Sequence, residues 1–321
     1  MPIAPVRKSN VAELAGATAA TMPTASITGV VAGNCLVAVV AAHRLSTSGN
    51  LVSAYGTTIS GSAANTWSLA ARSAFTSASG HRTEVTIWVA PNCSAGTTVG
   101  KPTLVNETTT IWHHFDEWPG IATSSPVDKT ATGGVASSVG TLTVGPTATL
   151  AQAASLQISA VADKFNYAWN GSGSGAGTPP TGHTILQGAA SSAILPAQSS
   201  YRELASTAGV SATWTTAEPT SHGTVGATVT LKIASLVKQL EITSLGGATI
   251  AGTTGWAAWM WTADPKDLKA VYFSGTDVTV TAGKIVLSNP PATITTGQQG
   301  QAILQNATLT TGLVQWTCVE V

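Results

Sequence analysis

The sequence predicts an all-β protein of two β-sandwich-like domains, and three observations support this prediction. Short runs of β-branched and aromatic residues alternate with Gly, Pro, Ser and Asn along the chain. Helical periodicity is almost absent, and only Asn10–Ala20 is compatible with one short helix, capped by Asn10 with Glu13 in its first turn. Hydrophobic residues make up 43% of the 321 residues and the net charge is zero, so we expect a folded chain.

The first predicted domain covers residues 1–235 and is expected to be a jelly-roll-like β-sandwich. Its apolar run Ile27–Ala42 is interrupted by Gly29 and Gly33, which predicts two buried strands or one bent strand rather than a membrane span. The spacing of strands and turns favours a sandwich or jelly roll over βαβ units. The predicted strands are Cys35–Ala42, Thr83–Val89, Thr109–Phe115, Ser138–Val144, Ser155–Val161 and Thr224–Ile233.

Two of these strands alternate strictly between aliphatic and other side chains. In Glu84–Val89, the aliphatic residues share one face, and Glu84, Thr86 and Trp88 share the other. In Thr224–Ile233, aliphatic residues alternate with threonines and a lysine. A period of two with a polar face is typical of a strand between core and water, so we expect one solvent-exposed face on each.

The domain boundary is predicted near Ala234–Leu240, where the last long strand of the first domain ends. Residues 236–321 then form a smaller unit, expected to be an immunoglobulin-like β-sandwich. The glycine-rich segment Asn170–Pro180 is too short for a domain linker and is expected to be an exposed loop. The strands predicted in the second unit are Trp256–Trp261, Asp277–Thr281, Lys284–Leu287, Gln301–Asn306 and Leu313–Val319.

The composition excludes several classes of function. Only 9% of the residues are charged, with 14 Lys and Arg against 14 Asp and Glu, so we expect no nucleic-acid partner. The N-terminal segment lacks the apolar stretch of a secretory signal, and we expect no membrane association. Three cysteines without a CxxC pair argue against a disulfide framework or zinc site, although a Cys35–Cys93 bridge stays open beside two buried thiols.

The densest polar cluster is the run Trp112–Trp118, which contains two histidines and two carboxylates. Such a cluster is compatible with a metal site or with acid–base chemistry. In a strand, however, His113 and Glu117 share one face while His114 and Asp116 share the other. Each face then offers two ligands where zinc needs three or four, so we favour a structural role and expect no metal.

Asp128 follows Pro126 and is expected to order a turn by bonding to its own backbone. Glu117 and Asp128 together could alternatively hold Ca²⁺ with loop carbonyls. The chain has no GxSxG, HExxH or phosphate-loop motif, and its scattered acids single out no catalytic pair. We therefore predict that the protein is not an enzyme and needs no cofactor.

Ten tryptophans are the remaining candidates for binding. Trp169 lies beside the glycine-rich segment and is the best candidate for an exposed ring that stacks on a sugar. In Trp256–Trp261, a regular strand places Trp259 and Trp261 on one face, either in the core of the small domain or on a contact surface.

An ordered series of segments carries a family resemblance. The series comprises Trp67-Ser68-Leu69, Arg82–Val89, Ala90–Thr98, Glu117-Trp118-Pro119-Gly120, Pro126–Ala131 and Gly226–Ile233. In this order, the segments resemble a β-sandwich domain that is common in virion proteins of tailed bacteriophages. The second domain resembles small β-sandwich modules of phage head or tail proteins in Trp259-x-Trp261, Gly283–Leu287 and Gly297–Gly300. The resemblance implies a role on the virion surface, and it implies that Glu117 accepts backbone or side-chain hydrogen bonds that fix the loop at Pro119 and Gly120.

The expected function is that of a structural component of a bacteriophage virion. We expect a capsid decoration (cement) or head-fibre protein that binds the major capsid protein, as a homo-oligomer and preferably a trimer. The alternative is a tail-associated or receptor-binding protein that adheres to a host surface glycan. A third hypothesis, a glycan-degrading enzyme, would use Glu117 or Asp128. The protein would be made in the cytoplasm of the bacterial host and end on the virion surface, on the capsid or the tail.

Overall fold

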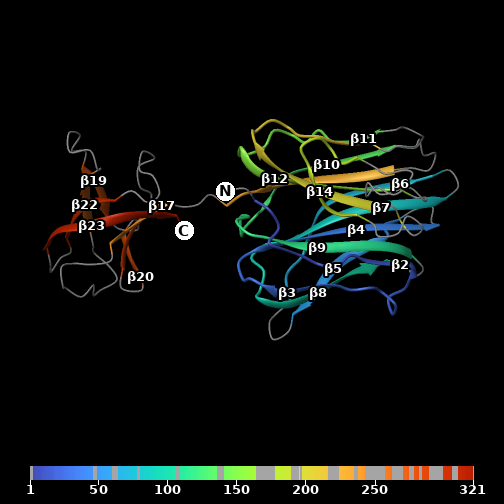
Figure 1. Ribbon diagram of the computed structural model, residues 1–321, viewed down its shortest axis with the longest axis horizontal. Helices are drawn as coiled ribbons and strands as arrows, with labels where there is room; N and C mark the ends of the chain where they lie inside the picture. Colours follow the sequence, from blue (N-terminus) through green and yellow to red (C-terminus); the bar gives the residue numbers. More distant parts are fainter. Residues whose placement is uncertain are drawn as a thin grey trace. The chain divides into compact units, whose positions relative to one another are not determined.

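The computed structural model shows two compact units, Met1–Ala234 and Ser235–Val321 (Figure 1). It describes residues 3–45, 49–59, 64–77, 80–105, 109–135, 141–163, 178–188, 195, 197–215, 224–234, 238–242, 257–261, 270–274, 278–281, 284–288, 299–305 and 310–320. Within these ranges the chain is all-β, as predicted, and contains no helix. None of these residues therefore belongs to a helix that could cross a membrane.

A six-stranded antiparallel sheet, here the central sheet, organises the first unit. Its strands follow the order β1-β9-β4-β7-β6, and β2 also pairs with β9. These strands are β1 (Arg7–Lys8), β2 (Ala12–Ala17), β4 (Cys35–Leu45), β6 (Ser68–Thr76), β7 (His81–Ala90) and β9 (Thr109–Trp118).

The described residues of the first unit also form three further sheets. The outer sheet contains β3 (Ala25–Val30), β8 (Gly96–Leu104) and β5 (Val52–Ile59). The five-stranded sheet contains β10 (Val127–Val135), β16 (Thr224–Lys232), β12 (Ala154–Ala162), β14 (Ala197–Ala205) and β13 (Thr184–Gly188). A two-stranded flap pairs β11 (Thr141–Val144) with β15 (Ala212–Thr215).

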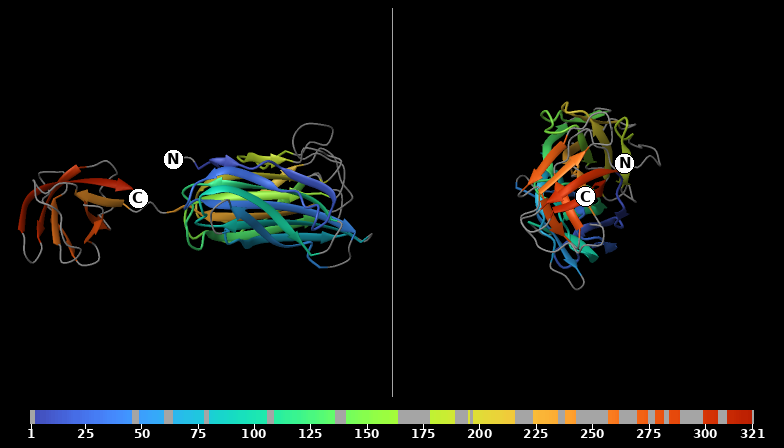
Figure 2. Two further views of the ribbon diagram at one scale, coloured as in Figure 1. Left: turned by 90° about the horizontal axis from the view of Figure 1, so that it is seen from below. Right: turned by 90° about the vertical axis from the view of Figure 1, so that its left-hand side faces the viewer.

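The cores between these sheets show that they stack as four layers. Val39 and Ile87 of the central sheet share one core with Val229 of the five-stranded sheet. On the opposite side, Phe115 of the central sheet packs in a second core with Tyr55 of the outer sheet. A small third core joins the flap to β12. The order of layers, from β11 through β10 and β7 to β8, is visible in Figure 1, and Figure 2 shows the strands running lengthwise through the unit.

This stacking makes the expected exposed faces of β7 and β16 wrong. Glu84 and Thr86 of β7 are fully buried, as are Thr228 and Thr230 of β16. The polar face of β7 lies under the outer sheet, and the outer face of the five-stranded sheet is covered in turn. Gly226 permits the flap to approach, because a Cβ at this position would lie 2.5 Å from Val144 Cγ2. In this fold, the polar residues of an alternating strand therefore lie at a buried interface between two sheets and not at the solvent-exposed surface.

The expected helix at Asn10–Ala20 is also wrong, because this segment forms β2. Its residues pair with β9, from Ala12 opposite His113 to Ala17 opposite Thr109, with a register shift that includes Gly16 at a φ of 67°. Asn10 does not cap a helix, because its Oδ1 accepts a hydrogen bond from Ser26 N at 2.9 Å. Pairing with the free edge of β9 thus overrides a weak local helix signal.

The expected strands of the first unit are present, with limits that differ by a few residues. The apolar run at 27–42 forms two strands, β3 and β4, in different sheets. Part of the expected strand at 138–144 lies outside the described residues, and β11 covers the remainder. The prediction missed several strands that carry few β-branched residues, such as β6 and β14.

The second unit forms one seven-stranded antiparallel sheet in the order β19-β18-β22-β23-β17-β21-β20. Its strands are β17 (Lys238–Ile242), β18 (Ala257–Trp261), β19 (Ala270–Ser274), β20 (Val278–Thr281), β21 (Lys284–Ser288), β22 (Gln299–Gln305) and β23 (Thr310–Glu320). All five strands expected from the sequence correspond to strands of this sheet, while β17 and β19 were not foreseen.

Candidate functional site

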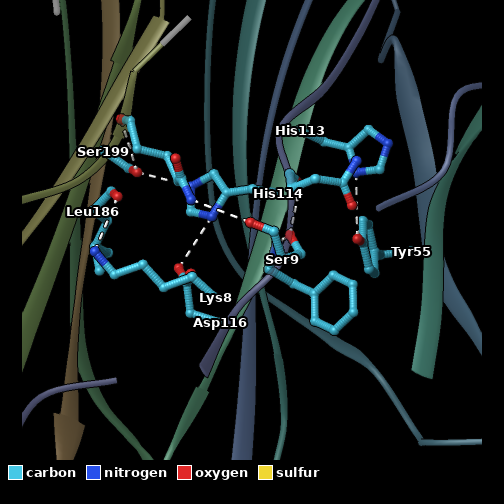
Figure 3. A network of polar contacts seen from close by, with 11 residues as sticks. Lys8, Ser9, Tyr55, His113, His114, Asp116, Leu186 and Ser199 are labelled. Carbon is cyan, nitrogen blue, oxygen red and sulfur yellow. Dashed lines mark hydrogen bonds and ion pairs between the residues drawn. The ribbon is translucent and has the colours of Figure 1, made fainter. Parts of the chain in front are cut away.

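The polar residues of β9 divide between two layers, as the alternation of a strand predicts. His113 faces the outer sheet, whereas His114 and Asp116 face the five-stranded sheet (Figure 3). Glu117 lies on the same face of β9 as His113. All four side chains are buried, with exposed fractions of 1% or less. The cluster is therefore two separate sites, one on each side of the central sheet.

His114 lies between a serine and an aspartate in the order of a nucleophilic triad. Its Nε2 is 2.8 Å from Ser199 Oγ, and its Nδ1 is 3.0 Å from Asp116 Oδ2 (Figure 3). Ser199 has no exposed surface, however, and its hydroxyl donates to the Gln187 carbonyl at 3.4 Å. A substrate has no access to this hydroxyl, so the contacts join β9 to β14 and present no nucleophile to solvent.

The same network fastens the N-terminal segment to the central sheet. Ser9 Oγ accepts a hydrogen bond from Phe115 N at 3.0 Å, and Gln187 Nε2 donates to the Ser9 carbonyl at 3.2 Å. Lys8 Nζ donates to the Leu186 carbonyl at 3.2 Å (Figure 3). These bonds tie the short strand β1 to the five-stranded sheet as well as to β9.

His113 is neutral, and its hydrogen bonds define its tautomer. Nε2 lies 3.0 Å from the Pro23 carbonyl, which only accepts, so this nitrogen carries the proton. Nδ1 then accepts from the Tyr55 hydroxyl at 3.4 Å. Burial lowers the pKa of His113 to about 4 and raises the pKa of Tyr55, so both groups keep these roles at neutral pH.

Glu117 is a hydrogen-bond hub for a turn distant in sequence. Oε1 accepts from Val31 N at 2.8 Å and from Asn34 Nδ2 at 2.6 Å, and Oε2 accepts from Arg7 Nη1 at 2.8 Å. The carboxylate thus fixes the turn between β3 and β4, together with β1. The family resemblance instead implied the loop at Pro119 and Gly120, which contributes none of these donors.

Glu84 of β7 plays a matching role that the sequence analysis missed. Its carboxylate accepts from Leu51 N at 3.0 Å and from Val52 N at 3.2 Å, and it lies 3.4 Å from Arg72 Nε. This arrangement anchors the start of β5 to the central sheet. The sequence carried no signal for this role, because Glu84 belongs to a polar face of an alternating strand, which is typical of a solvent-exposed surface.

Asp128 orders a loop, through a long-range contact. Its Oδ2 accepts from Ala151 N at 2.8 Å, and Oδ1 lies 3.6 Å from Lys129 Nζ. These bonds hold the segment before β12 against the start of β10, whereas the expectation was a bond to its own turn. In the part of the chain that the structure describes, no three His, Cys, Asp or Glu side chains converge as a metal site, and this includes Glu117 and Asp128.

The remaining candidates are distributed over both units. Trp169 lies outside the described residues. Trp259 and Trp261 belong to β18, where they pair with Tyr272 and Ala270 of β19. Cys35 and Cys93 are free buried thiols, so the alternative of a bridge is not realised, and burial raises the pKa of Cys93 to about 11.

The fold and these contacts define a charge-poor, layered all-β protein whose buried polar side chains hold strands and turns together. Comparison with protein-family models, with curated proteins and with solved structures finds no match to the chain.

Proposed function

We propose that the protein is a structural component of a bacteriophage virion, as a capsid decoration (cement) or head-fibre protein bound to the major capsid protein. In this proposal the first unit is a jelly-roll-like β-sandwich and the second an immunoglobulin-like one. The protein acts as a homo-oligomer, with a trimer favoured, on the virion surface after synthesis in the bacterial cytoplasm. It has no catalytic activity.

The outer face of the outer sheet is the observation that carries this proposal. Apart from two glycines, Gly29 and Gly56, its exposed residues are a single lysine, Lys101, and six hydroxyl residues: Ser26, Thr28, Ser53, Thr58, Thr97 and Thr103. A nearly uncharged face can pack against a neighbouring subunit without burying unpaired charges, which would each cost several kcal/mol.

The buried titratable side chains form hydrogen bonds and ion pairs inside the fold, which supports a non-catalytic role. Glu84, Glu117, His113, His114 and Asp116 are buried and bonded to the backbone or to other side chains. A general acid or base must reach its substrate within hydrogen-bond distance. These groups instead stabilise a rigid body, which a shell-bound protein needs.

A binding assay on capsids tests the proposal. Full-length protein is mixed with capsids that lack it, and the bound fraction is measured after sedimentation. We expect saturable binding, and Thr58→Glu should weaken it about tenfold or more because it places a charge within the contact. The matched control is Thr207→Glu, at an exposed residue remote from this sheet. Wild-type protein that never binds capsids would overturn the proposal, and normal binding by Thr58→Glu would exclude the outer sheet as the contact.

The second candidate function is a tail-associated or receptor-binding protein that adheres to a host glycan. One observation favours it, namely an open pocket around Arg202 that is lined by hydroxyl groups.

A further inference from the structure

A pocket of about 300 Å³ lies in the first unit, between β15 and the segment at 178–181. This volume is at the lower limit for small-molecule sites, which suits the end of a short ligand. The residues that line the pocket are Thr178, Pro179, Pro180, Thr181, Arg202, Ser211, Thr213 and Thr215. We call it the Arg202 pocket.

The walls of the Arg202 pocket are held by backbone hydrogen bonds. Thr178 N donates to the Thr215 carbonyl at 2.6 Å, and Thr215 N donates to the Thr178 carbonyl at 3.2 Å. His183 N donates to the Pro180 carbonyl at 2.9 Å and closes the turn that follows. The site is thus preformed, so a ligand would spend little of its binding free energy on ordering the protein.

Arg202 supplies a positive charge, and the hydrogen bonds of its guanidinium to described residues are made to neutral groups. Its Nε donates to Gln157 Oε1 at 2.7 Å, and its Nη2 donates to the Ser211 carbonyl at 3.2 Å. Among the described residues, no carboxylate pairs with Arg202 and no group accepts from its Nη1. A partly buried guanidinium without a counter-charge is a ready partner for an anion, above all for a carboxylate.

The other described residues of the lining are two prolines and five hydroxyl residues, none of which carries a charge. Thr178, Thr181, Ser211, Thr213 and Thr215 each bring a hydroxyl that both donates and accepts hydrogen bonds. Among the described residues that line the pocket, none is acidic and could repel an anion. Hydroxyls around one cation match a polyhydroxylated ligand that carries one negative charge.

We propose that the Arg202 pocket binds a carboxylate-bearing saccharide, with the sugar carboxylate on Arg202 and the sugar hydroxyls on the surrounding threonines and Ser211. A pocket of this volume accommodates the acidic sugar, and the rest of the saccharide would extend outside it. The inference does not rest on the capsid-binding proposal. It names the ligand class for the receptor-binding candidate, which the same pocket favours.

Titration of the full-length protein with saccharides, followed by ligand-observed NMR and calorimetry, tests this proposal. The probes are a disaccharide with a terminal hexuronate, its neutral hexose counterpart and inorganic phosphate. We expect the acidic disaccharide to bind about tenfold or more tightly than the neutral one, since a charged hydrogen bond is lost in the latter. Phosphate should bind more weakly than the acidic disaccharide, because it offers no hydroxyls for the threonines.

Variants locate the binding. Arg202→Gln should abolish the preference for the acidic disaccharide, while Arg44→Gln, which changes an arginine of β4, should leave it intact. Because Arg202 also supports the local structure, Thr181→Val provides a second test at an exposed residue and should weaken binding of both disaccharides severalfold.

Three results would each overturn the inference: no saccharide binding, equal affinity for the acidic and neutral disaccharides, or phosphate binding as tight as that of the acidic disaccharide. The capsid assay with Thr58→Glu does not involve this pocket, so failure of either proposal leaves the other distinguishable.

Discussion

Replacing Glu117 by Gln tests whether one buried carboxylate holds the turn between β3 and β4. In the variant, the amide oxygen can still accept from Val31 N and Asn34 Nδ2. The amide nitrogen, however, takes the place of Oε2 and faces Arg7 Nη1 at 2.8 Å. Two donors then oppose each other, and the ion pair is lost.

The expected loss of stability follows from this exchange. A hydrogen bond to a charged group contributes about 1.5–3 kcal/mol. The Arg7 side chain is 37% exposed and can turn toward water, which limits the penalty, whereas Glu117 has no exposed surface. We therefore expect Glu117→Gln to destabilise the first unit by about 2 kcal/mol. The turn at residues 31–34 should open about 30-fold more often if it loses the same free energy.

Hydrogen exchange resolved to peptides measures this opening at the Val31 amide. The matched control is Glu203→Gln, at an exposed glutamate of β14, where the amide oxygen can still accept the hydrogen bond from Ile3 N, so exchange of the Val31 amide should not change. The double variant Arg7→Gln with Glu117→Gln should be less destabilised than the sum of the single variants, because the two residues are in contact. Unchanged Val31 exchange together with a stability change below about 0.5 kcal/mol would refute the assigned role of Glu117.

Three further predictions concern other buried groups. The pKa of His113 is about 4 in the folded protein against an ordinary value of 6.5, so the unfolded chain binds more protons between these limits and stability falls as pH falls through them. At about pH 4.5 the free energy of unfolding should be about 2–3 kcal/mol lower than at neutral pH because of His113. In urea unfolding, His113→Gln should lose about that much less stability on acidification. The same pH dependence in the variant and the wild type would contradict this prediction. Gly226→Ala should destabilise the protein by about 2 kcal/mol in thermal unfolding, because the new Cβ would contact Val144 Cγ2. The control Gly134→Ala should be nearly neutral, because the nearest atom to a Cβ at that position is 3.7 Å away. Equal effects of the two variants would exclude the close approach of the flap as the cause. Cys35 and Cys93 should react with a thiol reagent only after unfolding, because both are buried with raised pKa values, and fast labelling of native protein would be the contrary result.

Much of the first unit could be predicted from the sequence because its central strands carry strong local signals. The aliphatic runs of β4, β7 and β16 are long and rich in β-branched residues. The sequence therefore predicts that these segments are strands and which of their residues lie on the same face. The strand β14, with the sequence AQSSYRELA, has no such signal. It becomes a strand because β12 and β13 pair with it on either side.

The burial of polar faces could not be predicted, because it depends on how many layers the chain stacks. Thr228 and Thr230 look like solvent-facing residues of a two-layer sandwich. They are buried since further segments cover the outer face of the five-stranded sheet. The same limitation made Glu84 look like a surface residue.

The partners of the candidate site residues were equally beyond local patterns. The side chains bonded to Glu117, and the Ser199 side chain bonded to His114, come from residues between 83 and 110 positions away. The sequence nevertheless predicted which faces of β9 these residues occupy, because a strand alternates whatever it packs against. Which residues contact these side chains could be known only from the folded structure.

The central claim, that the protein is part of a bacteriophage virion, is tested most directly by its location in intact particles of the phage proposed to carry it. Cryo-electron microscopy of purified virions, with antibody labelling against the full-length chain, would locate it at the surface. The proposed role predicts density that fits the four-layered first unit at regular positions on the capsid, in a fixed ratio to the major capsid protein. Mature particles that contain no copy of the chain would contradict the role, and copies confined to the tail would favour the receptor-binding alternative over decoration.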